Sequence, residues 1–203
     1  MSSGHYFAGD PSVGSEPRPV DVALPDVAFT LTADRGVFSA DHLDGGTKFL
    51  LLEAPPLTAA DRTVLDLGCG WGPIACVVAA RAPHAAVWAV DVNERARHLT
   101  ARNAASIGAE DQIRVVEPDG VPADVRFDRI LSNPPIRIGK PALHELLQRW
   151  LPRLMPNGCA HLVVQKHLGS DSLAAWLRRD GYGVERIKSR AGFRILEVRP
   201  GER

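Results

Sequence analysis

The stretch "VLDLGCGWGP" (64–73) decides the fold of this chain. Its apolar first half predicts a buried strand, and the alternate glycines that follow predict a tight turn into a helix. These glycines are Gly68, Gly70 and Gly72. The dinucleotide fingerprint G-x-G-x-x-G would need glycine where Pro73 stands. Three glycines alone also fit a purely structural turn, so the interpretation depends on the acids around them.

Two acids accompany the glycine turn. Asp66 lies on the strand that enters the turn, and Asp91 ends the next predicted strand. An acid at the first position suits a cationic group such as an ammonium, and one at the second can accept both hydroxyls of a ribose. Asp119 and Gly120, after the third strand, would reach the same edge of the sheet and contact an adenine, although "EPDG" also fits an ordinary turn. Together these groups describe S-adenosyl-L-methionine, the expected cofactor.

Strand and helix patterns alternate along most of the chain. Short loops between such units predict an α/β fold with a doubly wound, mostly parallel sheet and helices on both faces. Residues 1–19 are expected to be flexible, and residues 20–203 to form a single domain. The expected elements are a hairpin over 20–34, a short helix ending before Pro55, strands over 63–67, 85–90, 112–116, 126–132 and 159–165, helices over 72–81, 93–107, 140–154 and 170–181, and an antiparallel pair over 182–189 and 192–200.

The motif "DLGCGWG", with Asp91 at its spacing, resembles the class I methyltransferase family. That resemblance implies a seven-stranded, Rossmann-like sheet with an antiparallel last strand, which residues 191–198 would supply. It also implies that S-adenosyl-L-methionine binds at the glycine turn. Trp71, within the turn, would then edge the cofactor, unless it is simply packed in the core.

The stretch "LSNPPIRIGK" (131–140) ends the fourth strand of this series on a polar amide. Prolines cannot donate to a sheet ladder, so the strand has to stop there. Asn133 Oδ1 and the Pro134 carbonyl, stiffened by Pro135, predict a fixed pair of acceptors for a planar amine. N-P-P followed by an aromatic is the signature of amino-methyltransferases that act on adenine, guanine or a glutamine amide. Ile136 stands where that aromatic would stack on a flipped base, and a loop that merely needs prolines is the alternative.

Further segments extend the match from His5 to Val198. They are "GVFSADHLDGGTKFLL", "DLGCGWG", "SNPPIRIGK", "LHELL", "VVQK" and "GFRILEV". Together they resemble the family of 16S ribosomal RNA guanine-N2 methyltransferases (small subunit methyltransferase C type), in a single-domain form. The resemblance implies methyl transfer to the exocyclic N2 amine of a guanine in ribosomal RNA or the small ribosomal subunit. By the same resemblance, Phe38, Gly46 and Thr47 would cover the cofactor pocket.

These arguments define the expected site. The catalytic residues are Asn133, Pro134, Pro135 and Ile136. The cofactor-binding residues are Phe38, Thr47, Asp66, Gly68, Cys69, Gly70, Gly72, Asp91, Val92, Asp119, Gly120 and Asn133. The RNA-binding residues are Arg137, Lys140, Lys166, Arg190 and Arg194.

Charge is distributed unevenly although the formal net charge is zero. The first 120 residues carry 16 acidic and 9 basic side chains, and the remaining residues carry 8 and 15. The basic excess after residue 120 favours a polyanionic partner such as RNA. The same split also fits charges that fall on different helices of one mixed surface.

Composition and spacing argue against several other classes. The three cysteines have no paired spacing, which indicates reduced thiols rather than a disulfide framework or a zinc site. No apolar run has the length of a membrane span, and the N-terminus lacks a signal-peptide pattern. A cytoplasmic protein without metal, preferably monomeric, is therefore expected. Two alternatives stay open: methylation of a glutamine amide in a protein, and a methyltransferase-like module that binds RNA or protein without catalysis.

Overall fold

The computed structural model describes residues 14–201. The segment expected to be flexible lies largely outside this part of the chain, and the first strand begins within its last residues. The strands are β1 (Arg18–Ala23), β2 (Ala28–Ala33), β3 (Thr63–Leu67), β4 (Ala86–Val90), β5 (Ile113–Val116), β6 (Phe127–Ser132), β7 (Leu154–Gln165), β8 (Gly183–Arg190) and β9 (Phe193–Arg199). The helices are α1 (Gly45–Glu53), α2 (Pro73–Arg81), α3 (Glu94–Ser106), α4 (Lys140–Trp150) and α5 (Ser170–Arg179), with short 3-10 helices η1 (Pro118–Gly120), η2 (Ile136–Ile138), η3 (Leu151–Arg153) and η4 (Lys166–Leu168).

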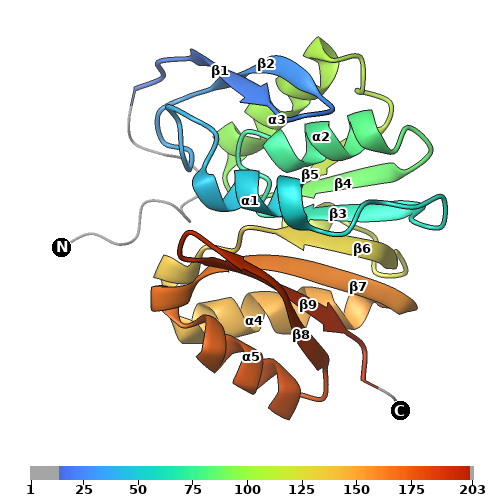
Figure 1. Cartoon of the computed structure of the whole chain (residues 1–203). Coiled ribbons are helices and arrows are strands. Elements are labelled where there is room, and N and C mark those ends of the chain that lie inside the picture. Colours follow the sequence, from blue (N-terminus) through green and yellow to red (C-terminus); the bar gives the residue numbers. More distant parts are fainter. Residues whose placement is uncertain (1–13, 202–203) are drawn as a thin grey trace.

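Seven of these strands form one sheet in the order β5-β4-β3-β6-β7-β9-β8. The five strands from β5 to β7 are parallel, and β9 pairs antiparallel with both of its neighbours. Figure 1 shows α1 and α2 on one face of this sheet and α4 and α5 on the other. The predicted doubly wound, mostly parallel sheet with an antiparallel last pair is confirmed.

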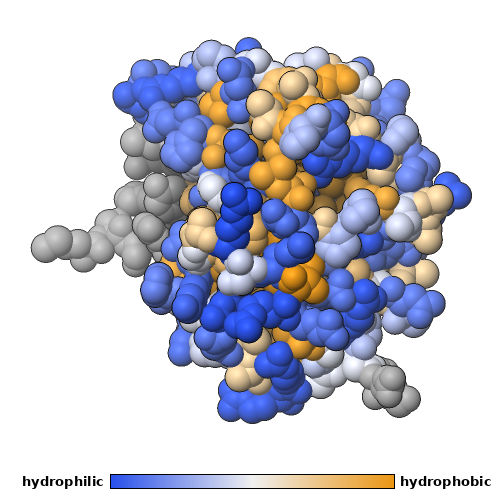
Figure 2. Space-filling view, in the orientation of Figure 1, coloured by the Kyte–Doolittle hydropathy of each residue, from blue (hydrophilic) through white to orange (hydrophobic). Residues whose placement is uncertain are grey.

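Each face of the sheet has its own apolar core, because successive strand residues point to opposite faces. Val64 and Val87 are fully buried in the core that α1, α2 and α3 cover. Leu65 and Ile130 are fully buried in the core beneath α4 and α5. Figure 2 shows a largely hydrophilic surface in this view, with apolar side chains visible mainly near α1 and α2.

The predicted N-terminal hairpin is confirmed as a separate two-stranded sheet of β1 and β2. Apolar side chains of the hairpin, such as Val22 and Leu31, are buried in the core of the domain, and the buried side chain of Asn103 on α3 adds hydrogen bonds. Its Oδ1 accepts the Thr32 N–H at 2.8 Å, while its Nδ2 donates to the carbonyls of Thr32 and Trp71 at 2.8 and 2.7 Å. The hairpin is thereby tied to the glycine turn as well as to α3.

The boundary between α4 and β7 differs from the sequence prediction. A helix over 140–154 was expected, but α4 ends at Trp150 and β7 already begins at Leu154. Pro152 explains the early end, because it lacks an N–H and its ring would clash with the carbonyl four residues before it. The chain instead makes one 3-10 turn and enters the sheet, where Leu154 pairs with Phe127.

The parallel strands place the chemistry-bearing segments at one edge of the sheet. β3 runs into the glycine turn, β4 ends before Asp91, and β6 ends before Asn133. The start of α1 lies beside these strand ends, on the left in Figure 1. Ser132 Oγ donates to the Leu67 carbonyl at 2.6 Å, which joins the ends of β6 and β3. Ligands of open α/β sheets bind at this kind of edge.

Candidate active site

A pocket of about 810 Å³ opens at this edge of the sheet. That volume lies within the usual range for small-molecule sites. Its walls come from the glycine turn, the end of β4, the N-P-P segment, the chain around the start of α1, and one side of α4. The lining includes these expected residues: Phe38, Thr47, Gly68, Cys69, Gly70, Asp91, Val92, Asn133, Pro134, Pro135 and Ile136.

The glycines of the turn have different roles. All three have positive φ, between 58° and 89°, which side chains other than glycine rarely adopt. Gly68 and Gly70 border the pocket, and a Cβ added at either one would meet no atom within 4 Å. Gly72 lies outside the described pocket lining, and a Cβ there would sit 2.9 Å from Thr100 Cγ2. The prediction that Gly72 binds cofactor is therefore corrected: it allows α3 to pack against the turn.

Gly72→Ala should destabilise the protein by about 2–4 kcal/mol, because a strained backbone and a steric clash add together. Gly108 is the matched control, since it has a similar φ of 69° but open space around its Cβ position. Gly108→Ala should cost only about 1–2 kcal/mol. Urea unfolding of both variants measures the difference, and equal losses would show that the Thr100 contact contributes nothing.

Asp91 joins the glycine turn to the end of β4. Its Oδ2 accepts the Gly70 N–H and its Oδ1 accepts the Asn93 N–H, each at 2.9 Å. Burial raises the pKa of this carboxyl, although the two backbone donors oppose the shift. Asp91 borders the pocket, and each of its oxygens keeps a further lone pair, so the carboxylate can accept two ribose hydroxyls.

Asp66 does not contribute to the described pocket lining. The side chain is fully buried, its Oδ2 accepts the Ala75 N–H at 2.9 Å, and its Oδ1 has no hydrogen-bond partner among the described residues. Burial raises the pKa of this carboxyl to about 8. The expected direct contact with a cofactor ammonium is therefore corrected: Asp66 lies beneath the turn and holds the first turn of α2.

The raised pKa of Asp66 predicts a pH-dependent stability. The folded protein keeps this proton up to about pH 8, whereas the unfolded chain loses it near pH 4. The free energy of unfolding should therefore fall as pH rises from about 4 to 8, by up to about 1.4 kcal/mol per pH unit, and change no further above 8. Asp66→Asn should flatten this slope in urea unfolding at pH 5, 6.5 and 8. Asp111→Asn, on the exposed surface, is the control, and parallel profiles for both variants would contradict the assignment.

Asp119 and Gly120 also lie outside the described pocket lining. The Asp119 side chain is mostly exposed, and its Oδ1 accepts Arg149 Nη2 at 2.7 Å. Pro118, the first residue of η1, borders the pocket instead. The expected adenine contact of the Asp119 side chain is therefore corrected to an ion pair that ties η1 to α4.

Asn133 lies in the pocket with a defined amide orientation. Its Nδ2 donates to Asp44 Oδ2 at 2.8 Å and to Thr47 Oγ1 at 3.0 Å. Both N–H groups of the amide are thereby used, and Oδ1 remains as an acceptor. Sequence reasoning missed Asp44, which caps α1 by accepting the Thr47 N–H at 2.9 Å. An acid three residues before the helix threonine is a recognisable N-cap signal, but its contact with Asn133 depends on the fold.

The prolines after Asn133 form a tight turn. The Pro134 carbonyl accepts the Ile136 N–H at 2.8 Å, and Pro135 has φ −73° and ψ 77°, which together define an inverse γ-turn. The expected acceptor at Pro134 is thus already used once. A carbonyl oxygen has two lone pairs, so one remains for a substrate amine.

The segment before α1 closes the pocket from the N-terminal side. Trp71 Nε1 donates to the Ser39 carbonyl at 3.2 Å, and Asn93 Nδ2 donates to the Gly36 carbonyl at 3.0 Å. Phe38, between these two anchors, borders the pocket and is 54% exposed. The indole of Trp71 itself is buried but also borders the pocket.

One wall of the pocket was not expected from the sequence. It is formed by α4, whose amphipathic pattern indicated only a core-facing stripe. The residues of α4 that border the pocket are Ala142, Glu145, Leu146, Arg149 and Trp150. With Asp44 and Asp91, the charged residues of the described lining are three acids and one arginine, which suits a cationic ligand.

The expected RNA-binding cations separate into two groups. Lys140, Lys166 and Arg190 are exposed, and Arg190 lies 3.9 Å from a carboxylate oxygen of Glu53. Arg194 is 7% exposed. Its Nη1 donates to Ser170 Oγ and to the Asp171 carboxylate. The prediction that Arg194 contacts phosphates is therefore corrected. The side chain of Arg137 lies outside the described part of the structure.

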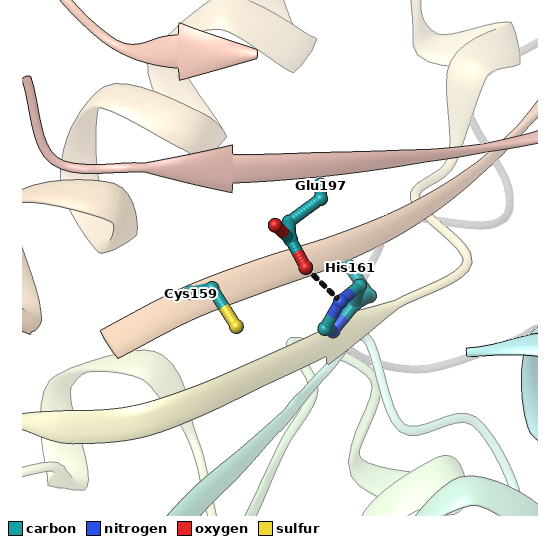
Figure 3. A group of neighbouring side chains, drawn as sticks. All are labelled: Cys159, His161 and Glu197. Atoms are coloured by element: carbon teal, nitrogen blue, oxygen red, sulfur yellow. Dashed lines mark hydrogen bonds and ion pairs between the residues drawn. The ribbon is translucent and has the colours of Figure 1, made fainter. Parts of the chain in front are cut away.

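A second group of polar side chains lies inside the sheet, away from the pocket. Figure 3 shows Cys159, His161 and Glu197 next to one another. Their ligand atoms all lie within 4.8 Å of one another. Arg129 Nη1 lies 3.3 Å from His161 Nδ1, and His161 Nε2 lies 3.0 Å from Glu197 Oε2. Arginine only donates, so Nδ1 accepts and Nε2 carries the proton. Both ring nitrogens therefore have protein partners, and burial lowers the pKa of His161 to about 4, so the histidine is neutral and packed within this group.

The sheet order, the glycine turn, Asp91 and the pocket above them define a class I, S-adenosylmethionine-dependent methyltransferase. A family model described as the methyltransferase small domain matches residues 28–197, and the chain belongs to that family. S-adenosyl-L-methionine is accordingly its cofactor, as predicted. Among the described residues, no helix is both long and apolar enough to cross a bilayer.

Several relatives share this family's sequence pattern. The chain is 32% identical to the uncharacterized protein YbxB of Bacillus subtilis over 97% of this chain and 98% of that protein. It is 34% identical to ribosomal RNA small subunit methyltransferase C of Shewanella oneidensis over 76% of this chain and 45% of that protein. It is 33% identical to ribosomal RNA large subunit methyltransferase G of Streptomyces avermitilis over 95% and 53%. The chain spans about half the length of these two ribosomal RNA methyltransferases.

A solved structure confirms the fold. The T. thermophilus 16S rRNA N2 methyltransferase RsmC, in complex with AdoMet and guanosine, superposes with a TM-score of 0.76 over 94% of this chain and 52% of that chain. Its sequence identity is 22%, so this likeness concerns the fold alone.

The residues of the pocket fit the cofactor. When bound, S-adenosyl-L-methionine supplies an electrophilic methyl group on a sulfonium. Asp91 presents two oxygens for a ribose, Gly68 and Gly70 leave room for close approach, and the acidic lining balances a positive charge. Asn133 places an acceptor oxygen in the same pocket.

Proposed function

We propose that this protein transfers a methyl group from S-adenosyl-L-methionine to the exocyclic N2 amine of a guanine in small-subunit ribosomal RNA. The observation that carries the proposal is the Asn133 amide, whose N–H groups are both held by protein acceptors inside the cofactor pocket. The Asn133 side chain can therefore accept a hydrogen bond from a substrate through Oδ1, but it has no free N–H to donate. The relatives named as ribosomal RNA small subunit methyltransferase C support ribosomal RNA as the substrate that presents this donor.

The chemistry needs positioning more than a reactive side chain. One N–H of the guanine amine donates to Asn133 Oδ1 and the other to the second lone pair of Pro134 O. These two bonds favour a pyramidal nitrogen, whose lone pair becomes available for attack on the methyl carbon. The nitrogen–carbon bond forms as the sulfur–carbon bond breaks, and the alkylated amine then loses a proton to water. Removal of the surplus proton needs no strong base.

The base has to leave its stack to reach Asn133, because a paired guanine hides this amine. Ile136 replaces the aromatic that is typical after N-P-P, and it borders the pocket. Phe38 and Phe193 are among the aromatic residues that border the same pocket. Their rings provide flat apolar surface on which a flipped base could stack. Stacking of the base therefore does not depend on an aromatic side chain at position 136.

The exposed cations around the pocket support an RNA partner. Lys140 starts α4 next to the N-P-P segment, and Lys166 follows β7 beside the pocket residue Gln165. Exposed lysines of this kind contact phosphates and release counterions, so binding of ribosomal RNA should weaken steeply as salt is added.

Methyl transfer from radiolabelled S-adenosyl-L-methionine tests the function directly. The substrates are free small-subunit ribosomal RNA, assembled small subunits and intact ribosomes, all from a strain that lacks this protein. Label in RNA, mapped to N2 of one guanine, is the expected result. Label in a protein glutamine would support the rival reading, and absence of measurable cofactor binding in calorimetry would support a non-catalytic module.

A further inference from the structure

We propose that Asp44 is a positioning residue that fixes the orientation of the Asn133 amide for methyl transfer. This inference rests on the proposed function, because it takes Asn133 Oδ1 as the acceptor of the substrate amine. Asp44 lies 89 residues before Asn133 and meets it only in the folded protein. Neither the glycine motif nor the N-P-P motif contains it.

The argument begins with the two possible orientations of a side-chain amide. Rotating the amide by half a turn exchanges its oxygen and its nitrogen while its shape hardly changes. In the observed orientation, Asn133 Nδ2 donates to Asp44 Oδ2 at 2.8 Å. The reversed orientation would set Asn133 Oδ1 against that carboxylate, so two acceptors would face each other. The reversed amide is therefore strongly disfavoured.

Thr47 cannot make this choice alone. Its hydroxyl accepts from Asn133 Nδ2 at 3.0 Å, but a hydroxyl both donates and accepts. It would bond to the amide in either orientation. The carboxylate of Asp44, which only accepts when ionised, is the contact that discriminates between the two.

Asp44 is itself held in place by α1. Its Oδ2 also accepts the Thr47 N–H at 2.9 Å, as the N-cap of this helix. The N-terminus of a helix favours a negative charge, so the position suits a carboxylate. The hydrogen bond that caps the helix and the hydrogen bond from Asn133 therefore share one acceptor, Asp44 Oδ2. The orientation of the Asn133 amide is thereby linked to the start of α1.

The fixed amide therefore selects a substrate group that donates hydrogen bonds to Asn133. With Nδ2 held by Asp44 and Thr47, the amide presents only Oδ1 to the substrate. A reversed amide would present its N–H groups to an amine and oppose binding in the reactive geometry. Loss of Asp44 should therefore slow methyl transfer without a matching loss of cofactor affinity.

Three substitutions separate this role from a structural one. Asp44→Ser keeps a good N-cap but is too short to reach Asn133 as well. Asp44→Asn keeps the length, and the Thr47 N–H would hold its amide oxygen in the place of Asp44 Oδ2, where it still accepts from Asn133, so this variant should restore most of the rate. Asp41→Ser is the matched control: Asp41 lies three residues upstream, is exposed, pairs with Arg18 and is outside the described pocket lining.

The first readout is kinetic. The single-turnover rate of methyl transfer to unmodified small-subunit ribosomal RNA should fall about 10- to 100-fold in Asp44→Ser. The dissociation constant of S-adenosyl-L-methionine, measured by calorimetry, should change less than about threefold, since one direct bond would be worth more than that. Asp41→Ser should match the unmodified protein in both. Rate and cofactor affinity lost in equal proportion in Asp44→Ser would overturn the inference, because Asp44 would then be a cofactor ligand.

The second readout does not depend on the substrate. The side-chain amide resonances of Asn133, identified in nitrogen-15 spectra by their loss in Asn133→Ala, should exchange slowly with solvent in the unmodified protein. Exchange should become fast in Asp44→Ser and stay slow in Asp44→Asn and Asp41→Ser. Unchanged exchange in Asp44→Ser overturns the inference. If the unmodified protein leaves ribosomal RNA unmethylated, the proposed function fails, while these spectra still decide the role of Asp44.

Discussion

Asn133→Ala should lower the turnover of methyl transfer by a hundredfold to a thousandfold while leaving cofactor affinity within about twofold. The substitution removes the oxygen that receives the substrate amine, and a preorganised hydrogen bond of this kind contributes about 3–4 kcal/mol to the transition state. The cofactor keeps Asp91 and the glycine turn, which form its own contacts. Steady-state kinetics with ribosomal RNA and calorimetry with S-adenosyl-L-methionine measure the two quantities.

A matched substitution separates the effect from a general loss of amide groups. Gln148 lies on the exposed face of α4, outside the described pocket lining, and Gln148→Ala should retain the full rate. Turnover of Asn133→Ala within about threefold of the unmodified protein, well under 1 kcal/mol, would refute the acceptor role. A loss of cofactor affinity as large as the loss of rate would point to misfolding of the pocket.

Asp91→Ala should have the opposite signature, with cofactor affinity reduced at least about a hundredfold, or roughly 2.8 kcal/mol. Two hydrogen bonds from a ribose to a carboxylate would be lost, each worth about 1.5–3 kcal/mol. The backbone N–H groups of Gly70 and Asn93 would also lose the acceptor that holds them at 2.9 Å. Calorimetry of S-adenosyl-L-methionine binding, without any RNA, is sufficient to test this.

Asp119→Ala is the matched control for the ribose assignment. Asp119 was a second predicted cofactor acid, with an ordinary turn as the alternative, but its carboxylate pairs with Arg149 on the surface. Its removal should change the dissociation constant less than about twofold, because exposed ion pairs contribute little. An effect of Asp119→Ala as large as that of Asp91→Ala would return the adenine contact to this side chain. Unchanged affinity in Asp91→Ala would remove the ribose assignment.

The features predicted well were those that local pattern determines. The glycine turn follows a buried strand, and strand–helix alternation requires parallel strands whose carboxyl ends share one edge. Asp91 and Asn133 each directly follow a parallel strand, so their positions in the sequence are enough to place them at that edge. Pro152 was the exception: α4 ends before it, although the apolar spacing continues beyond it.

The features that failed concern the depth and direction of side chains. Asp66 lies on a strand beside the turn, as expected, but packing of α2 against β3 buries its carboxylate below the pocket. Arg194 lies on a strand, β9, as expected, but the start of α5 covers its side chain and supplies its hydrogen-bond acceptors. Whether such a residue is free or enclosed depends on elements that are distant in the sequence, and no local pattern reports this.

The sequence by itself determined which functional groups follow the parallel strands: a glycine turn after β3, an acid after β4 and an amide after β6. Hydrophobic periodicity and turn residues act over a few neighbouring positions, so they can be read from the chain directly. Only the tertiary structure decided which way the Asn133 amide points, because Asp44, 89 residues earlier in the chain, and Thr47 contact it from the start of α1. A contact of that kind is set by the packing of α1 on the sheet, and it determines which atom the pocket offers to a substrate.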